Sequence, residues 1–249
     1  LIALHTSPDG TNINRDCGST HMEELAARVA AEGADCGLAF DGDADRFLAV
    51  DEKGAIVNGD QIMAVVGRHL KQQGKLAQDT VVVTVMSNLG FFLCCDREGL
   101  RIEKTQVGDR YVLEEMQKGG YNFGGEQSGH VIYLDENTTG DGLLSALHLL
   151  QVMKETGRSL SELASICEMM PQALVNAPVS NDKKEHYMEF PEVAEACRAL
   201  EQEFAGEGRV LIRPSGTEPL VRVMIEGRDG EVIRARAQAL ADLIERVMA

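Results

Sequence analysis

Three aspartates at alternate positions, Asp41, Asp43 and Asp45, follow an apolar stretch at residues 36–40. Carboxylates spaced in this way along an extended loop can converge on one hard cation. Mg²⁺ prefers such oxygen ligands and usually keeps coordination positions for a substrate phosphate. The pattern therefore predicts a magnesium site that receives a phosphorylated compound, and the alternative is an acidic turn without a ligand.

Two other chemistries could use the same aspartates. An EF-hand loop also has acids at its first, third and fifth positions and a Glu at its twelfth, which Glu52 would supply, but its sixth position needs glycine and here is Arg46. The flanking segments also have the pattern of strands rather than helices. A strand that ends in Asp-x-Asp is typical of aspartyl-phosphate hydrolases as well, in which Asp41 would be the nucleophile.

A second cluster of polar groups lies in the glycine-rich segment 124–130. Its glycines let the backbone approach a ligand closely, while Glu126, Ser128 and His130 offer an acceptor, a hydroxyl and an imidazole within five positions. Sugar hydroxyls need groups of this kind. The alternative is a glycine-rich turn with one hydrogen-bonded histidine.

A third cluster, residues 213–219, lies between two predicted strands. It contains hydroxyls and main-chain N–H groups around a glycine, which together form an anion nest, and two arginines could add charge-assisted bonds to phosphate oxygens. A plain hairpin loop is the alternative. The candidate phosphate ligands are Arg213, Ser215, Gly216, Thr217 and Arg222.

Two further polar stretches have weaker patterns. Asp109 lies between a short strand and a helix and could be an acid or base, although an N-terminal helix cap is the favoured role. The charged run 181–184 is predicted to be a solvated surface loop.

The elements that position these clusters alternate between strand and helix, which predicts an α/β class. Segments 40–46 and 123–129 each have a strand before the loop and an apolar strand ending in aspartate after it, then Gly-Asp and an amphipathic helix. Four features in the same order indicate a duplicated domain. The helices are predicted at 61–72 and 142–154, with Asp60 and Asp141 as their caps.

The last third of the chain has a different order, β-α-β-β-α, which is typical of an α+β domain. The predicted strands and helices are 173–179, 191–204, 209–212, 221–226 and 231–248. The predicted domains are 1–77, 78–170 and 171–249.

Composition limits the partners of the chain. Forty acidic against twenty-four basic residues give a net charge of −16, which argues against nucleic acid or an anionic membrane as a partner. The sequence has no apolar run of membrane-spanning length, so a cytoplasmic location is expected. Its six cysteines lie mostly in apolar stretches and are predicted to be reduced core residues.

The three polar clusters together resemble the α-D-phosphohexomutase superfamily, over essentially the whole sequence. Segments 12–14, 17–20, 124–130 and 213–219 are most similar to the phosphoglucosamine mutases within it. The resemblance implies part of a second and all of a third α/β/α domain, followed by a fourth domain similar to the TATA-box-binding protein. In that superfamily four domains surround a central cleft.

The resemblance also implies roles for the candidate residues. The three aspartates would hold Mg²⁺, Arg46 would lie beside the reacting phosphoryl group, and the groups at 126, 128 and 130 would contact the sugar. The loop has Ala44 where many relatives have glycine. The implied reaction is phosphoryl transfer from an enzyme phosphoserine to glucosamine 6-phosphate, through glucosamine 1,6-bisphosphate or a similar hexose bisphosphate, to glucosamine 1-phosphate for cell-wall precursors. The sequence leaves the oligomeric state open, with a homodimer as one option.

One family feature has no counterpart in the sequence. Relatives carry the serine nucleophile in a Thr-Ala-Ser-His-Asn-Pro type loop, whereas Ser7 and Ser19 have the context of loop or cap residues. The chain, which starts in an apolar run at Leu1, is therefore expected to be a cut piece that binds substrate without turning it over. Phosphomannomutase or phosphoglucomutase specificity, or a non-catalytic phosphosugar-binding module, are the alternatives.

Overall fold

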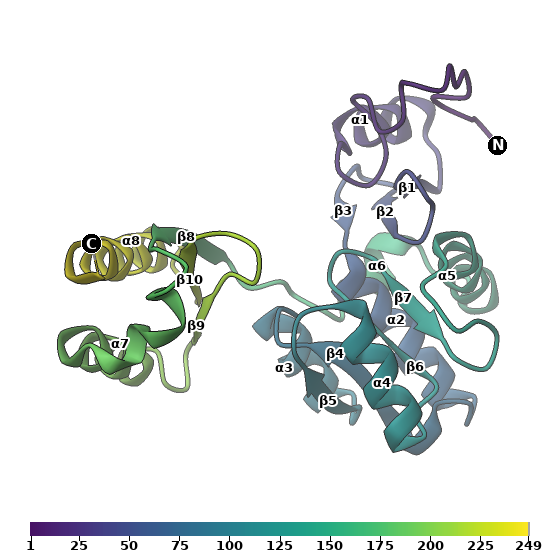
Figure 1. Cartoon of the computed structure of the whole chain (residues 1–249). Helices are drawn as coiled ribbons and strands as arrows, with labels where there is room; N and C mark the ends of the chain where they lie inside the picture. The colour runs from purple at the N-terminus through teal and green to yellow at the C-terminus, as the bar shows by residue number, and fades with distance from the viewer. Residues whose placement is uncertain (249) are drawn as a thin grey trace. The chain divides into compact units, whose positions relative to one another are not determined.

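The computed structural model describes residues 1–248, which form two compact units (Figure 1). The first unit contains residues 1–168, and the second begins at Met169. Each unit has its own hydrophobic core.

The first unit opens with a small antiparallel sheet. Its strands β1 (Cys36–Phe40), β2 (Phe47–Asp51) and β3 (Ile56–Val57) lie in sequence order, and Phe40 pairs with Phe47 at the mouth of the β1–β2 loop. The helix α1 (Glu23–Glu32) packs against β1 and β2. The aspartate cluster therefore occupies a hairpin loop whose two ends are fixed by strand pairing.

A four-stranded sheet and the helices around it form the rest of this unit. Its order is β5-β4-β6-β7, with β4 parallel to β5 and β6 and with β7 antiparallel at the edge. All five residues of β4 are buried, as a parallel strand covered on both faces requires. The strands are β4 (Thr80–Thr84), β5 (Arg101–Thr105), β6 (Phe123–Gly125) and β7 (Val131–Tyr133). The helices are α2 (Gly59–Gln72), η1 (Ala77–Asp79), α3 (Leu89–Arg97), α4 (Asp109–Gly119), α5 (Gly142–Thr156) and α6 (Leu160–Ala164).

The repeated plan is present in the structure. The aspartate loop joins β1 to β2, the glycine-rich loop joins β6 to β7, both pairs are antiparallel, and a long helix follows each pair. Of the two predicted caps, Asp141 accepts a hydrogen bond from the Leu144 N–H and caps α5, but the prediction for Asp60 is wrong. Asn58 caps α2 through a capping box with Gln61. The helix therefore begins at Gly59, two residues before the predicted start at 61.

The second unit confirms the order β-α-β-β-α. Its antiparallel sheet has the order β8-β10-β9, and α7 and α8 lie on the same face of it (Figure 1). A 3-10 helix, η2, is added between β8 and α7. The elements are β8 (Gln172–Pro178), η2 (Lys184–Glu189), α7 (Pro191–Glu203), β9 (Arg209–Pro214), β10 (Leu220–Glu226) and α8 (Gly230–Met248).

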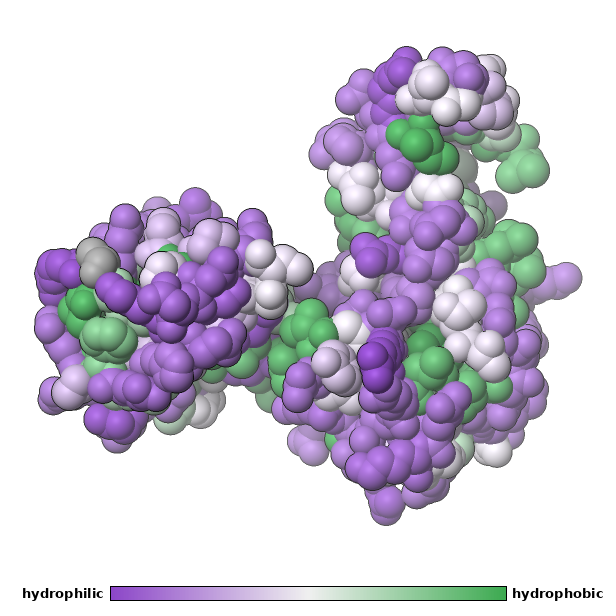
Figure 2. Space-filling model, in the orientation of Figure 1, coloured by the Kyte–Doolittle hydropathy of each residue, from purple (hydrophilic) through white to green (hydrophobic). Residues whose placement is uncertain are grey.

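The surface hydropathy, the helices and the cysteines can be compared with the expectations from composition. Hydrophilic residues cover most of the face drawn in Figure 2, with only scattered hydrophobic patches. Within residues 1–248, no helix combines the length and the apolar character that a bilayer crossing needs. Four of the six cysteines are buried.

A carboxylate joins the end of β2 to helix α6 in the first unit. Glu52, after β2, accepts hydrogen bonds from the main-chain N–H and the hydroxyl of Ser161 in α6. Burial raises the pKa of Glu52, but the bonds from Ser161 and neighbouring groups outweigh it, and the pKa falls to about 2.

Replacing Glu52 by Gln is expected to lower the free energy of unfolding by about 1 kcal/mol at pH 7, since one charge-assisted pair of bonds is lost at a partly exposed site. The folded-state pKa is below the ordinary value of 4.5, so this stabilisation exists above pH 4.5 and disappears as the pH falls toward 2. Urea unfolding at pH 7, 5, 4 and 3.5 should show the variant and wild type converging. A constant difference at every pH would contradict this, and Glu103→Gln, at an exposed position, is the control.

Candidate functional site

The aspartate loop brings its three carboxylates together. One oxygen from each of Asp41, Asp43 and Asp45 lies within 4.8 Å of the other two. Oxygens on opposite sides of an octahedral Mg²⁺ are about 4.2 Å apart, so small side-chain movements would close the cluster on this ion. Two hydrogen bonds within the loop fix its shape, from the Ala44 N–H to the Asp41 carbonyl at 3.2 Å and from the Arg46 N–H to the Asp41 carboxylate at 3.1 Å.

The residues around the cluster fit a cation. The pKa of Asp45 is raised by burial and by the neighbouring Asp41 carboxylate, and the hydrogen bond from His130 offsets only part of this rise. A divalent cation would offset the repulsion between the carboxylates. The guanidinium of Arg46 is 3.8 Å from Asp41 and about half exposed, so it remains accessible to a ligand.

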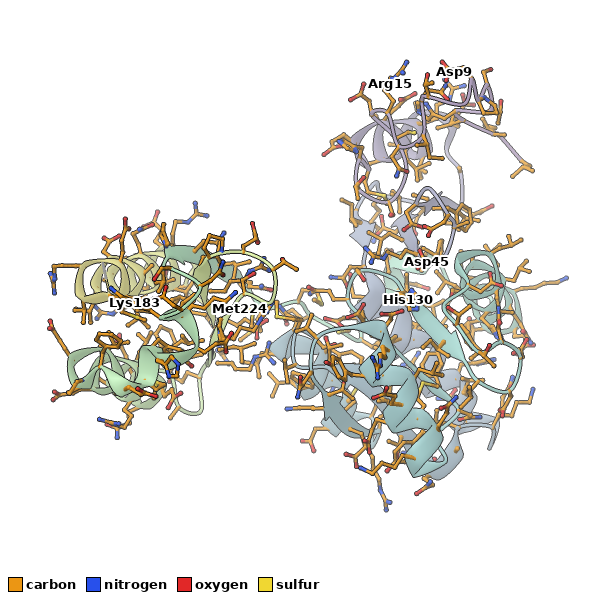
Figure 3. The ribbon with its side chains drawn as sticks, in the orientation of Figure 1. Asp9, Arg15, Asp45, His130, Lys183 and Met224 are labelled. Carbon is orange, nitrogen blue, oxygen red and sulfur yellow. The ribbon has the colours of Figure 1, made fainter. Side chains whose placement is uncertain are left out.

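His130 joins this loop to the glycine-rich loop. Its side chain is buried, and Nδ1 lies 2.9 Å from the Asp45 carboxylate. Both residues are labelled in Figure 3. Because Nε2 accepts a hydrogen bond from the Gly140 N–H at 3.1 Å, the neutral ring carries its proton on Nδ1 and donates it to Asp45. The structure therefore places His130 beside a candidate metal ligand, and this role was missed in the sequence because 85 positions separate the two residues.

Main-chain bonds hold the same two loops together. The Phe47 N–H donates to the Gly129 carbonyl at 3.1 Å, and the Gly59 N–H donates to the Gln127 carbonyl at 3.0 Å. The start of β2 and the start of α2 thus both bind the glycine-rich loop. These bonds hold the glycine-rich loop against both elements.

The predicted sugar contacts have different surroundings. The Glu126 carboxylate accepts from the Gly108 N–H at 3.2 Å, which ties this loop to the loop before α4, whereas Ser128 is exposed. Asp109 is not the cap predicted from the sequence. Gly108 occupies the N-cap position, and Asp109 is the first helical residue, exposed and 3.9 Å from His130 Nε2.

In the second unit, the predicted phosphate loop has two arginines at its base. Arg213 on β9 and Arg222 on β10 are directly paired, so their side chains leave the same face of the sheet. Burial, together with the charge of Arg222, lowers the pKa of Arg213. Arg222 also donates to the Glu218 carboxylate at 2.6 Å, and a bound phosphate would compete with Glu218 for it.

The turn itself offers hydrogen-bond donors. The Ser215 N–H donates to the Leu220 carbonyl at 2.9 Å, and the Glu218 N–H donates to Ser215 Oγ at 3.2 Å, so Ser215 is buried within the turn. The N–H groups of Gly216 and Thr217 make no hydrogen bond to any of residues 1–248, and both residues are exposed. Two free main-chain donors beside two guanidinium groups have the composition of an anion site.

Lys184 lies behind this turn, contrary to the prediction of a solvated loop at 181–184. It is buried, with 6% of its surface exposed. Its Nζ donates to the main-chain carbonyls of Ser215 and Glu218, the latter at 3.0 Å. The prediction was wrong for this residue because a polar run in a sequence does not show which of its side chains a loop will cover.

Comparison with known families gives consistent matches along the chain. Residues 1–54 match "Phosphoglucomutase/phosphomannomutase, alpha/beta/alpha domain II", residues 58–170 match domain III of the same family, and residues 174–243 match its C-terminal domain. Phosphoglucosamine mutases from Ruminiclostridium cellulolyticum and Acetivibrio thermocellus are 61% and 60% identical to it, over 98% of this chain in each case. The chain spans 55% of the length of each of these relatives.

Solved structures share the fold. A phosphoglucomutase/phosphomannomutase family protein from Burkholderia thailandensis has a TM-score of 0.76 at 23% identity, and it covers 98% of this chain and 54% of its own. The Aspergillus fumigatus N-acetylphosphoglucosamine mutase, solved with GlcNAc-6P and magnesium, has a TM-score of 0.73 at 19% identity, with 95% of this chain and 54% of its own covered. The chain therefore belongs to the phosphoglucomutase/phosphomannomutase family and is a homologue of phosphoglucosamine mutases over domains II, III and the C-terminal domain.

Proposed function

We propose that this chain is the substrate- and Mg²⁺-binding part of a phosphoglucosamine mutase, which interconverts glucosamine 6-phosphate and glucosamine 1-phosphate. The observation that carries the proposal is the hydrogen bond between Asp45 and His130, because it joins the candidate metal loop to the candidate sugar loop. The 61% identity to a phosphoglucosamine mutase favours this substrate over hexose phosphates.

Each loop has a distinct task in this proposal. Asp41, Asp43 and Asp45 would hold Mg²⁺, which would stabilise negative charge on the phosphoryl group in transfer. Arg46 would contact that phosphoryl group. Glu126 and Ser128 would bind sugar hydroxyls. His130 would orient Asp45 in addition to contacting the sugar.

The second unit would hold the phosphate that is not transferred. Arg213 and Arg222 supply charge, and the N–H groups of Gly216 and Thr217 supply directed hydrogen bonds, with Ser215 shaping the turn. A site that binds either phosphate of a hexosamine bisphosphate would allow the intermediate to bind in both directions. The nucleophilic serine of the reaction is not among the residues that we assign, and the chain alone is expected to bind glucosamine 1-phosphate without converting it.

Calorimetric titration of the chain with glucosamine 1-phosphate, in the presence of Mg²⁺, tests the proposal. Replacing Arg213 by Ala should weaken binding about 10- to 100-fold, since a hydrogen bond between charged groups contributes about 1.5–3 kcal/mol. Arg234→Ala, which removes an exposed arginine from α8 in the same unit, should leave the affinity unchanged.

Three outcomes of the same experiment would contradict the proposal. Equal affinity for glucosamine and glucosamine 1-phosphate would show that no phosphate is recognised. Tighter binding of glucose 1-phosphate or mannose 1-phosphate would favour the hexose specificities. Release of inorganic phosphate from the ligand would favour a hydrolase in which Asp41 is the nucleophile.

A further inference from the structure

The ammonium group of Lys184 has an unusual position for a lysine. It is buried, and its two acceptors are the main-chain carbonyls of Ser215 and Glu218. Among residues 1–248 no carboxylate lies within ion-pair distance of it. A buried charge without an opposite partner is costly, so a purely structural role would be served better by an apolar side chain.

The two acceptor carbonyls belong to the turn that carries the candidate anion site. Ser215 and Glu218 are the residues on either side of Gly216 and Thr217, whose N–H groups are the free donors of the turn. When the carbonyls of a turn point inward to a cation, the N–H groups between them are free to point outward. Lys184 therefore fixes the orientation in which the turn presents its donors to an anion.

The positive charge of Lys184 would also favour the binding of an anion at the turn. Arg213 and Arg222 lie on the strands that carry the turn, so three cationic side chains surround one short loop in a chain of net charge −16. Their only carboxylate partner among the described residues is Glu218, which pairs with Arg222. An anion bound at the turn would offset this excess of positive charge.

We propose that Lys184 is a positioning residue of the phosphate site. By binding the carbonyls of Ser215 and Glu218 it keeps the N–H groups of Gly216 and Thr217 directed toward the anion, and its positive charge adds to the electrostatic attraction for the anion. The inference rests on the proposed function, because it concerns the same phosphate. It assigns a role in anion binding to a residue outside the Arg213–Pro219 motif.

Lys184→Met is the variant that tests it, since methionine keeps most of the apolar stem and removes the charge and its donors. Affinity for glucosamine 1-phosphate should fall about 10-fold or more, and affinity for inorganic phosphate should fall with it. The salt dependence of binding should also become shallower, because one cation fewer contributes to the field at the anion. A packing role would not change that slope.

Lys183→Met is the matched control. Lys183 is the preceding residue, labelled in Figure 3, and its Nζ donates to the Met248 carbonyl in α8 at 3.1 Å. This variant should keep wild-type affinity and slope. Equal affinity of folded Lys184→Met and wild type would overturn the inference, as would equal losses in both lysine variants.

Amide hydrogen exchange tests the positioning without a ligand. In Lys184→Met, the N–H groups of Ser215 and Glu218 should exchange about 10-fold faster than in wild type, while those of central β10 keep their protection. Unchanged exchange would contradict the positioning role. If wild type fails to bind any phosphosugar, the proposed function fails, and the exchange rates still decide whether Lys184 holds the turn.

Discussion

Replacement of Asp43 by Asn is expected to lower the affinity of the chain for Mg²⁺ by at least about 100-fold. Loss of a group that only supports a metal ligand commonly costs 10- to 100-fold, so loss of a charged ligand should cost no less. Asp43 is the most informative of the three aspartates to change. It is exposed, whereas Asp41 and Asp45 also hold the Arg46 N–H and His130, so that changing them would disturb the loop itself.

Calorimetric titration with MgCl₂ gives the affinity directly. Thermal unfolding gives a second measurement, since an ion at 100 times its dissociation constant stabilises the folded state by about 2.7 kcal/mol. Wild type should be stabilised by Mg²⁺ and Asp43→Asn should not. Asp35→Asn removes the same charge from an exposed position just before β1 and should behave as wild type. Equal affinity of wild type and Asp43→Asn would show that this loop is not the metal site.

The elements of the fold could be predicted from the sequence because their signals are local. The strands predicted at 173–179, 209–212 and 221–226 lie within a residue or two of those observed. The cap of α5 by Asp141 followed from the same kind of signal. Asn58 and Gln61 have the spacing of a capping box, and this local signal is a better guide to the cap of α2 than the repeated Gly-Asp pair, which places Asp60 inside the helix.

Contacts between distant segments could not be predicted in this way. Nothing in the spacing of Asp45 and His130 indicates their hydrogen bond, which depends on how two hairpins pack. Lys184 has the same explanation, since its burial depends on a turn about 30 residues later in the chain. The sequence therefore identified the candidate loops, and the structure supplied the contacts between them.

Gly129→Ala is expected to have the largest effect on the assembly of the metal and sugar loops. Gly129 has a φ of +95°, and a Cβ at this position would lie 2.2 Å from the Phe47 carbonyl oxygen. Left-handed strain and the clash together should cost about 3 kcal/mol or more. The contact is with main chain, so no side-chain rotation can relieve it.

The clash should weaken the main-chain hydrogen bonds that hold the glycine-rich loop against β2 and α2. The Phe47 N–H donates to the Gly129 carbonyl and the Gly59 N–H to the Gln127 carbonyl, so both amides should exchange faster in Gly129→Ala, and Mg²⁺ affinity should fall with them. Gly157→Ala is the matched control, because Gly157 also has a positive φ, +64°, but has no atom of residues 1–248 within 4 Å of the added Cβ. It should cost only the backbone strain of about 1 kcal/mol and leave Mg²⁺ affinity unchanged. If the two variants lose stability equally and bind Mg²⁺ equally, the close packing of the glycine-rich loop against β2 does not hold the metal loop in place, and the hydrogen bond from His130 to Asp45 would have to do so alone.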